Sequence, residues 1–66
     1  MGGVEAIFVY AFEYFNESSG QWQRGPVPAT LAAISRYGWR AIPGPARQMF
    51  ESAIAANGVA FRWPSA

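Results

Sequence analysis

Residues 5–15, EAIFVYAFEYF, are the stretch that decides how this chain folds. Most of them are β-branched or aromatic, the types that fit a pleated sheet, so the stretch predicts a β-strand. Because side chains alternate along a strand, one face would carry five of them: Ile7, Val9, Ala11, Glu13 and Phe15. The opposite face would carry four aromatic side chains: Phe8, Tyr10, Phe12 and Tyr14. Both faces are mostly apolar, so we expect both to be shielded from water by other parts of the protein or by a partner. The pattern leaves open which face turns toward the core.

A β-hairpin is predicted around the polar segment at 16–20, NESSG. These turn-forming residues end in glycine and separate the first strand from QWQR at 21–24, where the alternating pattern resumes. The second strand should end at Gly25 and Pro26, because proline has no N–H to donate to a strand ladder.

Residues 28–37 predict a helix. Pro28 suits the first helical position, where a missing N–H costs nothing, and Gly38 suits the position just after the last turn. Apolar residues at three-to-four spacing predict one stripe that packs on the sheet: Val27, Leu31, Ile34 and Tyr37.

The remainder of the chain allows two interpretations. Residues 39–42 form a short strand in both, and a strand at 59–63 closes the chain in both. In the first interpretation a second helix covers 45–56, which the alanine-rich composition favours. In the second, a strand at 47–51 and a helical turn at 52–56 lead into a tight turn at Asn57 and Gly58.

We therefore predict a single small α+β domain over residues 1–66. A mainly antiparallel sheet contains the hairpin and two or three further short strands, and one helix packs on it. The second helix at 45–56 is left open, and residues 1–4 and 64–66 are expected to be flexible tails.

The small size of the chain raises the question of what stabilises it. A core of 66 residues rarely supplies more than about 3–5 kcal/mol, and natural chains this short usually add a cross-link, a metal or a partner. Cysteine is absent, which excludes a disulfide, and histidine and aspartate are absent too, so we expect no structural zinc. Association with a second copy or another protein is the remaining source of stability.

The charges of the chain are five arginines and four glutamates, with a net charge of +1. That surplus is too small to predict a nucleic-acid partner by itself. No apolar stretch reaches the roughly 18 residues that a membrane helix needs. The segment at 1–6, MGGVEA, carries no basic residue before the apolar run, so we predict no signal peptide and a cytoplasmic location.

A series of short motifs in this order resembles short uncharacterised proteins of bacterial or prophage type. After the hairpin come PATLAAI at 28–34, IPG at 42–44, ES at 51–52 and NG at 57–58. In such proteins the segment before Asn-Gly is often acidic, whereas here it is AIAA at 53–56. The resemblance covers most of the chain and favours the strand and turn interpretation of the last third. It implies no function and no catalytic residue.

Catalysis has few candidate groups in this sequence. Without histidine, cysteine, lysine or aspartate, the four glutamates are the only carboxyl side chains that could form an acid/base pair. Glu13 is the most notable, since it shares a strand face with apolar residues. We expect it to be exposed or paired with an arginine, because a buried unpaired carboxylate is costly. We therefore predict a protein that is not an enzyme and has no cofactor or metal.

The aromatic residues are the remaining functional candidates, and we expect a non-enzymatic module that forms a homodimer or binds another protein. Six residues are the predicted interface: Phe8, Tyr10, Phe12, Tyr14, Trp22 and Trp63. The alternative is a weak binder of single-stranded nucleic acid, with bases stacked on the aromatics and arginines at the phosphates. Three arginines would serve that alternative: Arg24, Arg40 and Arg62. We prefer the first interpretation, because small domains commonly use aromatics for bulk in the core and at self-association faces.

Overall fold

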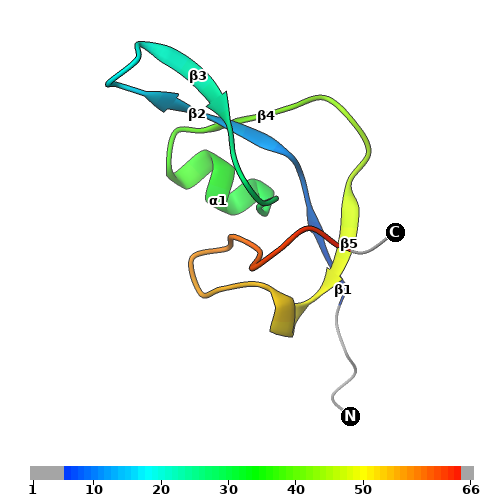
Figure 1. Cartoon of the computed structure of the whole chain (residues 1–66). Helices are drawn as coiled ribbons and strands as arrows, with labels where there is room; N and C mark the ends of the chain where they lie inside the picture. The colour runs from blue at the N-terminus through cyan, green and yellow to red at the C-terminus, as the bar shows by residue number, and fades with distance from the viewer. Residues whose placement is uncertain (1–5, 65–66) are drawn as a thin grey trace.

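The computed structural model describes residues 6–64 (Figure 1). The tail predicted at 1–4 lies outside the described residues, as do residues 65 and 66 of the tail predicted at 64–66. The elements in chain order are β1 (Ala6–Val9), β2 (Phe12–Asn16), β3 (Gln21–Arg24), α1 (Leu31–Arg36), β4 (Arg40–Ala41), β5 (Arg47–Phe50) and the 3-10 turn η1 (Glu51–Ala53). The predicted α+β class, with antiparallel strands and one helix, is confirmed.

The strands form two antiparallel sheets rather than one. β2 lies between β3 and β4, while β1 pairs with β5. Figure 1 shows the β2–β3 hairpin at one end of the molecule and β1 beside β5 at the other. The hairpin is confirmed: the Asn16 side chain accepts a hydrogen bond of 2.9 Å from the Ser18 N–H, and Gly20 closes the turn with a φ of 71°.

The predicted single strand at 5–15 is divided in the structure. β1 and β2 are separated at Tyr10 and Ala11, where Tyr10 instead forms an isolated bridge with Ala29. The prediction of one uninterrupted strand is wrong because its hairpin partner, β3, has only four residues. The first half of the stretch finds its partner in β5, far along the chain.

Each face of this stretch is covered over only part of its length, and a different cluster covers each. Val9 is 0% exposed and packs with Met49 and Ala60, while Phe12 is 3% exposed and packs against Ala29 and helix α1. Tyr10 belongs to the Phe12 cluster, although it directly follows Val9. Consecutive strand residues point to opposite sides, so the two clusters cover opposite faces of the stretch. The inward face therefore changes between β1 and β2.

The helix is shorter than predicted and begins later. Thr30 is its N-cap, and its hydroxyl oxygen accepts a hydrogen bond of 3.2 Å from the Ala33 N–H. The placement of Pro28 at the first helical position is wrong: threonine supplies the preferred cap, and Pro28 is buried before it with its carbonyl accepting a bond from the Ala60 N–H. Gly38, with a φ of 72°, follows the helix as predicted.

The predicted apolar stripe of the helix is correct only in part. Ile34 is buried, and so is its neighbour Ala33, but Leu31 and Tyr37 are exposed. The helix has only six residues, so just one side of it can lie against the sheet. The small side chain of Ala33 allows close contact with the turn at Gly58, where an added Cβ would lie 2.8 Å from the Ala33 Cβ.

The last third follows the strand and turn interpretation, and a helix over 45–56 is wrong. β5 places Met49 opposite Ile7 and buries it with Val9, and this tertiary contact overrides the helix propensity of the alanines. The helical turn predicted at 52–56 is replaced by η1, while Gly58 makes the expected turn with a φ of 89°.

The two short strands predicted at 39–42 and 59–63 are less extensive in the structure than the sequence indicates. The strand at 39–42 is β4, of two residues, although the Ile42 N–H still donates to the Ala11 carbonyl at 2.9 Å. The closing strand at 59–63 is wrong, because only Val59 and Ala60 form isolated bridges. Those bridges, to Ala29 and to Ile54, tie the C-terminal segment to the centre of the molecule.

Candidate functional site

A large share of the apolar side chains remains at the surface. Among the described residues, eight large hydrophobic side chains are exposed: Phe8, Phe15, Trp22, Leu31, Tyr37, Phe50, Phe61 and Trp63. Five of these lie on the outer faces of the two sheets or directly beside them. Because large exposed apolar patches mark interaction sites, these outer faces are the candidate functional surfaces.

The three-stranded sheet carries aromatic and charged side chains on its outer face. Phe15 of β2 pairs with Trp22 of β3, and Glu13 of β2 pairs with both Arg24 of β3 and Arg40 of β4. Paired residues point to the same side of a sheet, so all five side chains share one face. We call this surface the arginine–tryptophan face, and it consists of Glu13, Phe15, Trp22, Arg24, Arg40 and the adjoining Trp63.

Arg40 connects the charged and aromatic parts of the arginine–tryptophan face. Its Nε donates a hydrogen bond of 2.8 Å to Oε1 of Glu13, and its Cζ lies 4.2 Å from the centre of the Trp22 ring. Trp22 in turn meets Phe15 edge to face, with ring centres 5.6 Å apart. The prediction that Glu13 is exposed or paired with an arginine is confirmed. The Glu13 carboxylate is thus held in an ion pair with Arg40.

A second arginine–tryptophan contact lies at the other end of this face. The Cζ of Arg24 is 5.5 Å from the centre of the Trp63 ring, and the Trp63 indole N–H donates a hydrogen bond of 2.7 Å to the Pro26 carbonyl. Beside them is a groove of about 270 Å³, which we call the arginine groove. Its walls are formed by Arg24, Arg47, Trp63 and the loop at 42–45. Among the described residues, no carboxylate lines it.

The two-stranded sheet presents an outer face of a different kind. The β1–β5 register pairs Ala6 with Phe50 and Phe8 with Gln48, so these four side chains share one face. We call it the phenylalanine face. Phe8 is 55% exposed and Phe50 is 63% exposed, and no residue of this face is charged.

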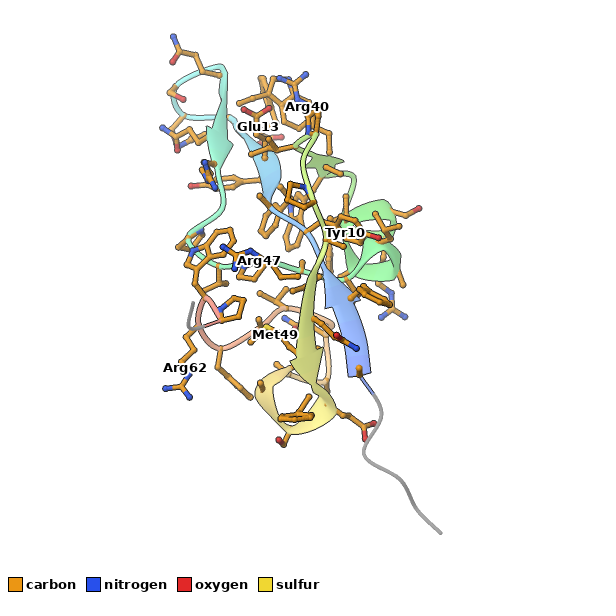
Figure 2. The ribbon with its side chains drawn as sticks, turned by 90° about the vertical axis from the view of Figure 1, so that its right-hand side faces the viewer. Tyr10, Glu13, Arg40, Arg47, Met49 and Arg62 are labelled. Atoms are coloured by element: carbon orange, nitrogen blue, oxygen red, sulfur yellow. The ribbon has the colours of Figure 1, made fainter. Side chains whose placement is uncertain are left out.

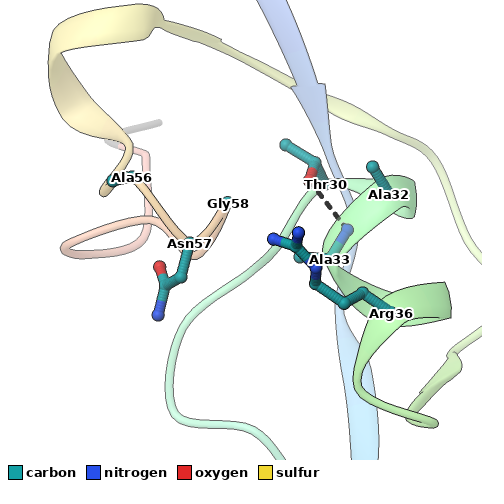
Figure 3. A pocket seen from close by; sticks show the side chains of 7 residues that line it. All are labelled: Thr30, Ala32, Ala33, Arg36, Ala56, Asn57 and Gly58. Carbon is teal, nitrogen blue, oxygen red and sulfur yellow. Dashed lines mark hydrogen bonds between the residues drawn. The ribbon is translucent and has the colours of Figure 1, made fainter.

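A second hollow, of about 410 Å³, lies between α1 and the turn at 57–58 (Figure 3). Its polar groups already serve the fold. The Thr30 hydroxyl caps the helix, and the Asn57 side-chain oxygen accepts a hydrogen bond of 3.1 Å from the Val59 N–H. Arg36 supplies the only charge of its lining. We therefore place no functional site there.

The six predicted interface residues are divided among three places. Phe8 lies on the phenylalanine face, whereas Trp22 and Trp63, 37% and 36% exposed, lie on the arginine–tryptophan face. Phe12 lies in the core, and Tyr10 and Tyr14 are partly buried against the same cluster. This inner position fits the expectation that small domains use aromatics for bulk in the core.

The three predicted arginines are divided as well. Arg24 and Arg40 flank Glu13 on the arginine–tryptophan face, whereas the Arg62 side chain points outward from the molecule, far from Glu13 and Arg40 (Figure 2). Sequence reasoning missed Phe15, Arg47 and Phe50. A symmetric hairpin register would have placed Phe15 opposite Trp22, and alternation within a strand at 47–51 would have placed Phe50 on the outside.

No group of three or more potential metal ligands lies together among residues 6–64. Within the same residues, no helix is long and apolar enough to cross a membrane.

No protein-family model, no curated protein and no solved structure matches this chain.

Proposed function

We propose that this protein is a non-enzymatic interaction module that forms a homodimer through the phenylalanine face. The observation that carries the proposal is the exposure of Phe8 and Phe50, 55% and 63%, on one uncharged surface. The two residues are diagonal neighbours across β1 and β5, a spacing of about 7–8 Å, so they form one continuous apolar patch.

A second copy of this chain is the partner that fits this patch best. A twofold interface brings the same surface together from both sides, so its residues must tolerate their own copies. Ala6, Phe8, Gln48 and Phe50 meet that requirement, because no like charges would face each other. A two-stranded sheet is only marginally stable by itself, and burying one phenylalanine contributes roughly 1.5–3 kcal/mol. Dimerisation would therefore stabilise the part of the fold that most needs support.

Light scattering across a dilution series tests this proposal. We expect a dimer that dissociates on dilution, and a Phe8→Ser/Phe50→Ser double variant that stays monomeric at every concentration. Phe61→Ser is the matched control, since Phe61 is equally exposed but belongs to neither face. A wild-type chain that is monomeric throughout, or a Phe61→Ser variant that loses the dimer as well, would contradict the proposal.

A charge variant keeps the test valid if the double variant fails to fold. Gln48→Arg retains both phenylalanines and places a positive charge on each copy of the phenylalanine face. Its dimer should dissociate more readily at low salt and recover at high salt, because salt screens like charges. A dimer that is insensitive to this substitution would place the interface elsewhere.

A further inference from the structure

We infer that the arginine groove and the adjoining arginine–tryptophan face bind single-stranded nucleic acid. One phosphate would lie between Arg24 and Arg47, and bases would stack along the aromatic side chains. This site is separate from the phenylalanine face and goes beyond self-association.

The first argument is the distribution of charge. Arg24, Arg40 and Arg47 lie on this surface with only Glu13 as a counter-charge, a surplus of two, whereas the whole chain has a net charge of +1. The rest of the chain is therefore negative by one. Since Glu13 is held by Arg40, the surplus belongs to Arg24 and Arg47, which form no ion pair within residues 6–64. Two such guanidinium groups at one groove form a site for an anion.

The second argument is the shape of the groove. Its wall at 43–45 is Pro-Gly-Pro, and the fixed φ of proline leaves little conformational freedom to lose when a ligand binds. At about 270 Å³ the groove is smaller than the roughly 300–1,000 Å³ of pockets that enclose a drug-sized molecule. It has room for a phosphate and part of its sugar, while the rest of the ligand would lie outside.

The third argument is the aromatic track that leads out of the groove. Ala11 lies at the groove just before β2 begins, and Phe15 lies near the other end of β2, about 10 Å from Phe12 at the usual rise of an antiparallel strand. Trp63 lies at the groove end of this track and Trp22 at the far end, each beneath an arginine. A ligand that reaches both ends must be extended and must offer planar groups for stacking. Single-stranded nucleic acid has both properties, and its unpaired bases stack readily on aromatic side chains.

The test is a titration of the full chain with a single-stranded oligothymidine about ten nucleotides long, followed by tryptophan fluorescence. We expect quenching, and a binding constant that falls with salt with a logarithmic slope of about −0.7, the value for one phosphate contact on a single strand. Arg47→Gln should weaken binding about fivefold to tenfold and make the salt dependence shallower, because only Arg24 is left to neutralise the phosphate. Arg62→Gln, which removes the same charge away from the groove, should change neither quantity.

Three outcomes would overturn the inference: no binding at low salt, equal losses in the Arg47→Gln and Arg62→Gln variants, or equally tight binding of polyglutamate. The last result would mean a general anion site or an acidic peptide partner. The Phe8→Ser/Phe50→Ser variant separates this inference from the proposed function. As a monomer it should bind the oligonucleotide with unchanged intrinsic affinity, so either proposal can fail while the other stands.

Discussion

The two sheets of this protein expose aromatic side chains in different chemical surroundings. On β1 and β5, Phe8 and Phe50 lie on a surface without charge. At the three-stranded sheet, Trp22 of β3 and the adjoining Trp63 each lie beneath an arginine. The stretch at 5–15 supplies β1 to one sheet and β2 to the other. Its large outward side chain on β1 is Phe8, whereas on β2 the outward side chains are Glu13 and Phe15, which belong to the opposite face of the stretch. The difference teaches that exposed aromatics are not one kind of site: the uncharged patch fits a second copy of itself, and the cationic one fits an anionic ligand.

The largest expected effect contrasts the two faces of β2. Phe12→Ala should cost about 3–5 kcal/mol, which is as much as a core of this size supplies, so the variant should be largely unfolded. Phe15→Ala removes a ring of the same size from the outer face and should cost about 1 kcal/mol or less, mainly through its contact with Trp22. Urea unfolding followed by circular dichroism measures both. Equal losses of stability would mean that the inward face of β2 has been misassigned.

A smaller effect is expected at Gly25, which lies against the outer edge of the Phe12 ring, at Cζ and the two Cε atoms. An added Cβ would overlap the ring atoms of Phe12, so Gly25→Ala should cost about 1–3 kcal/mol through overpacking. Gly20→Ala is the matched control in the same hairpin. Its Cβ would meet nothing within 4 Å, and its φ of 71° should cost about 1 kcal/mol. If Gly20→Ala proves the more harmful substitution in thermal unfolding, the Phe12 cluster is less tightly packed at β3 than we describe.

The smallest effect on stability is expected for Glu13→Gln. This substitution tests whether the arginine–tryptophan face and the phenylalanine face act independently. The Glu13–Arg40 pair is partly solvent-exposed, so its loss should cost less than about 1 kcal/mol. The substitution leaves Arg40 unpaired on the arginine–tryptophan face, so oligonucleotide affinity should rise while the dimer remains unchanged. A weakened dimer in light scattering would show that the two faces are not independent.

Some of this arrangement could be predicted from the sequence, because local signals determine it. The NESSG segment specifies the β2–β3 hairpin, and Gly38 ends the helix as a residue that accepts a positive φ. The pairing of Glu13 with an arginine follows from the cost of leaving a carboxylate buried alone.

Tertiary contacts determine the rest, and a single sequence does not show them. Nothing local in residues 5–15 indicates that pairing changes at Tyr10, since this depends on Ala29 forming a bridge there. Residues 45–56 satisfy a helical pattern, and only the burial of Met49 against Val9 selects the strand. Phe50 is exposed on the phenylalanine face and Arg47 lines the arginine groove only because this segment is a strand. Sequence reasoning therefore missed one residue of each candidate surface.

The central claim is that the phenylalanine face binds a second copy and the arginine–tryptophan face binds the oligonucleotide. The most direct test is to measure molar mass by light scattering for the wild-type chain and for the Phe8→Ser/Phe50→Ser variant. Each protein is measured with and without the oligonucleotide. We expect the wild type at dimer mass and the variant at monomer mass, with both masses increasing when oligonucleotide is added. A variant that remains dimeric, or a wild-type chain that is monomeric until oligonucleotide joins two copies, would contradict the assignment of self-association to the phenylalanine face.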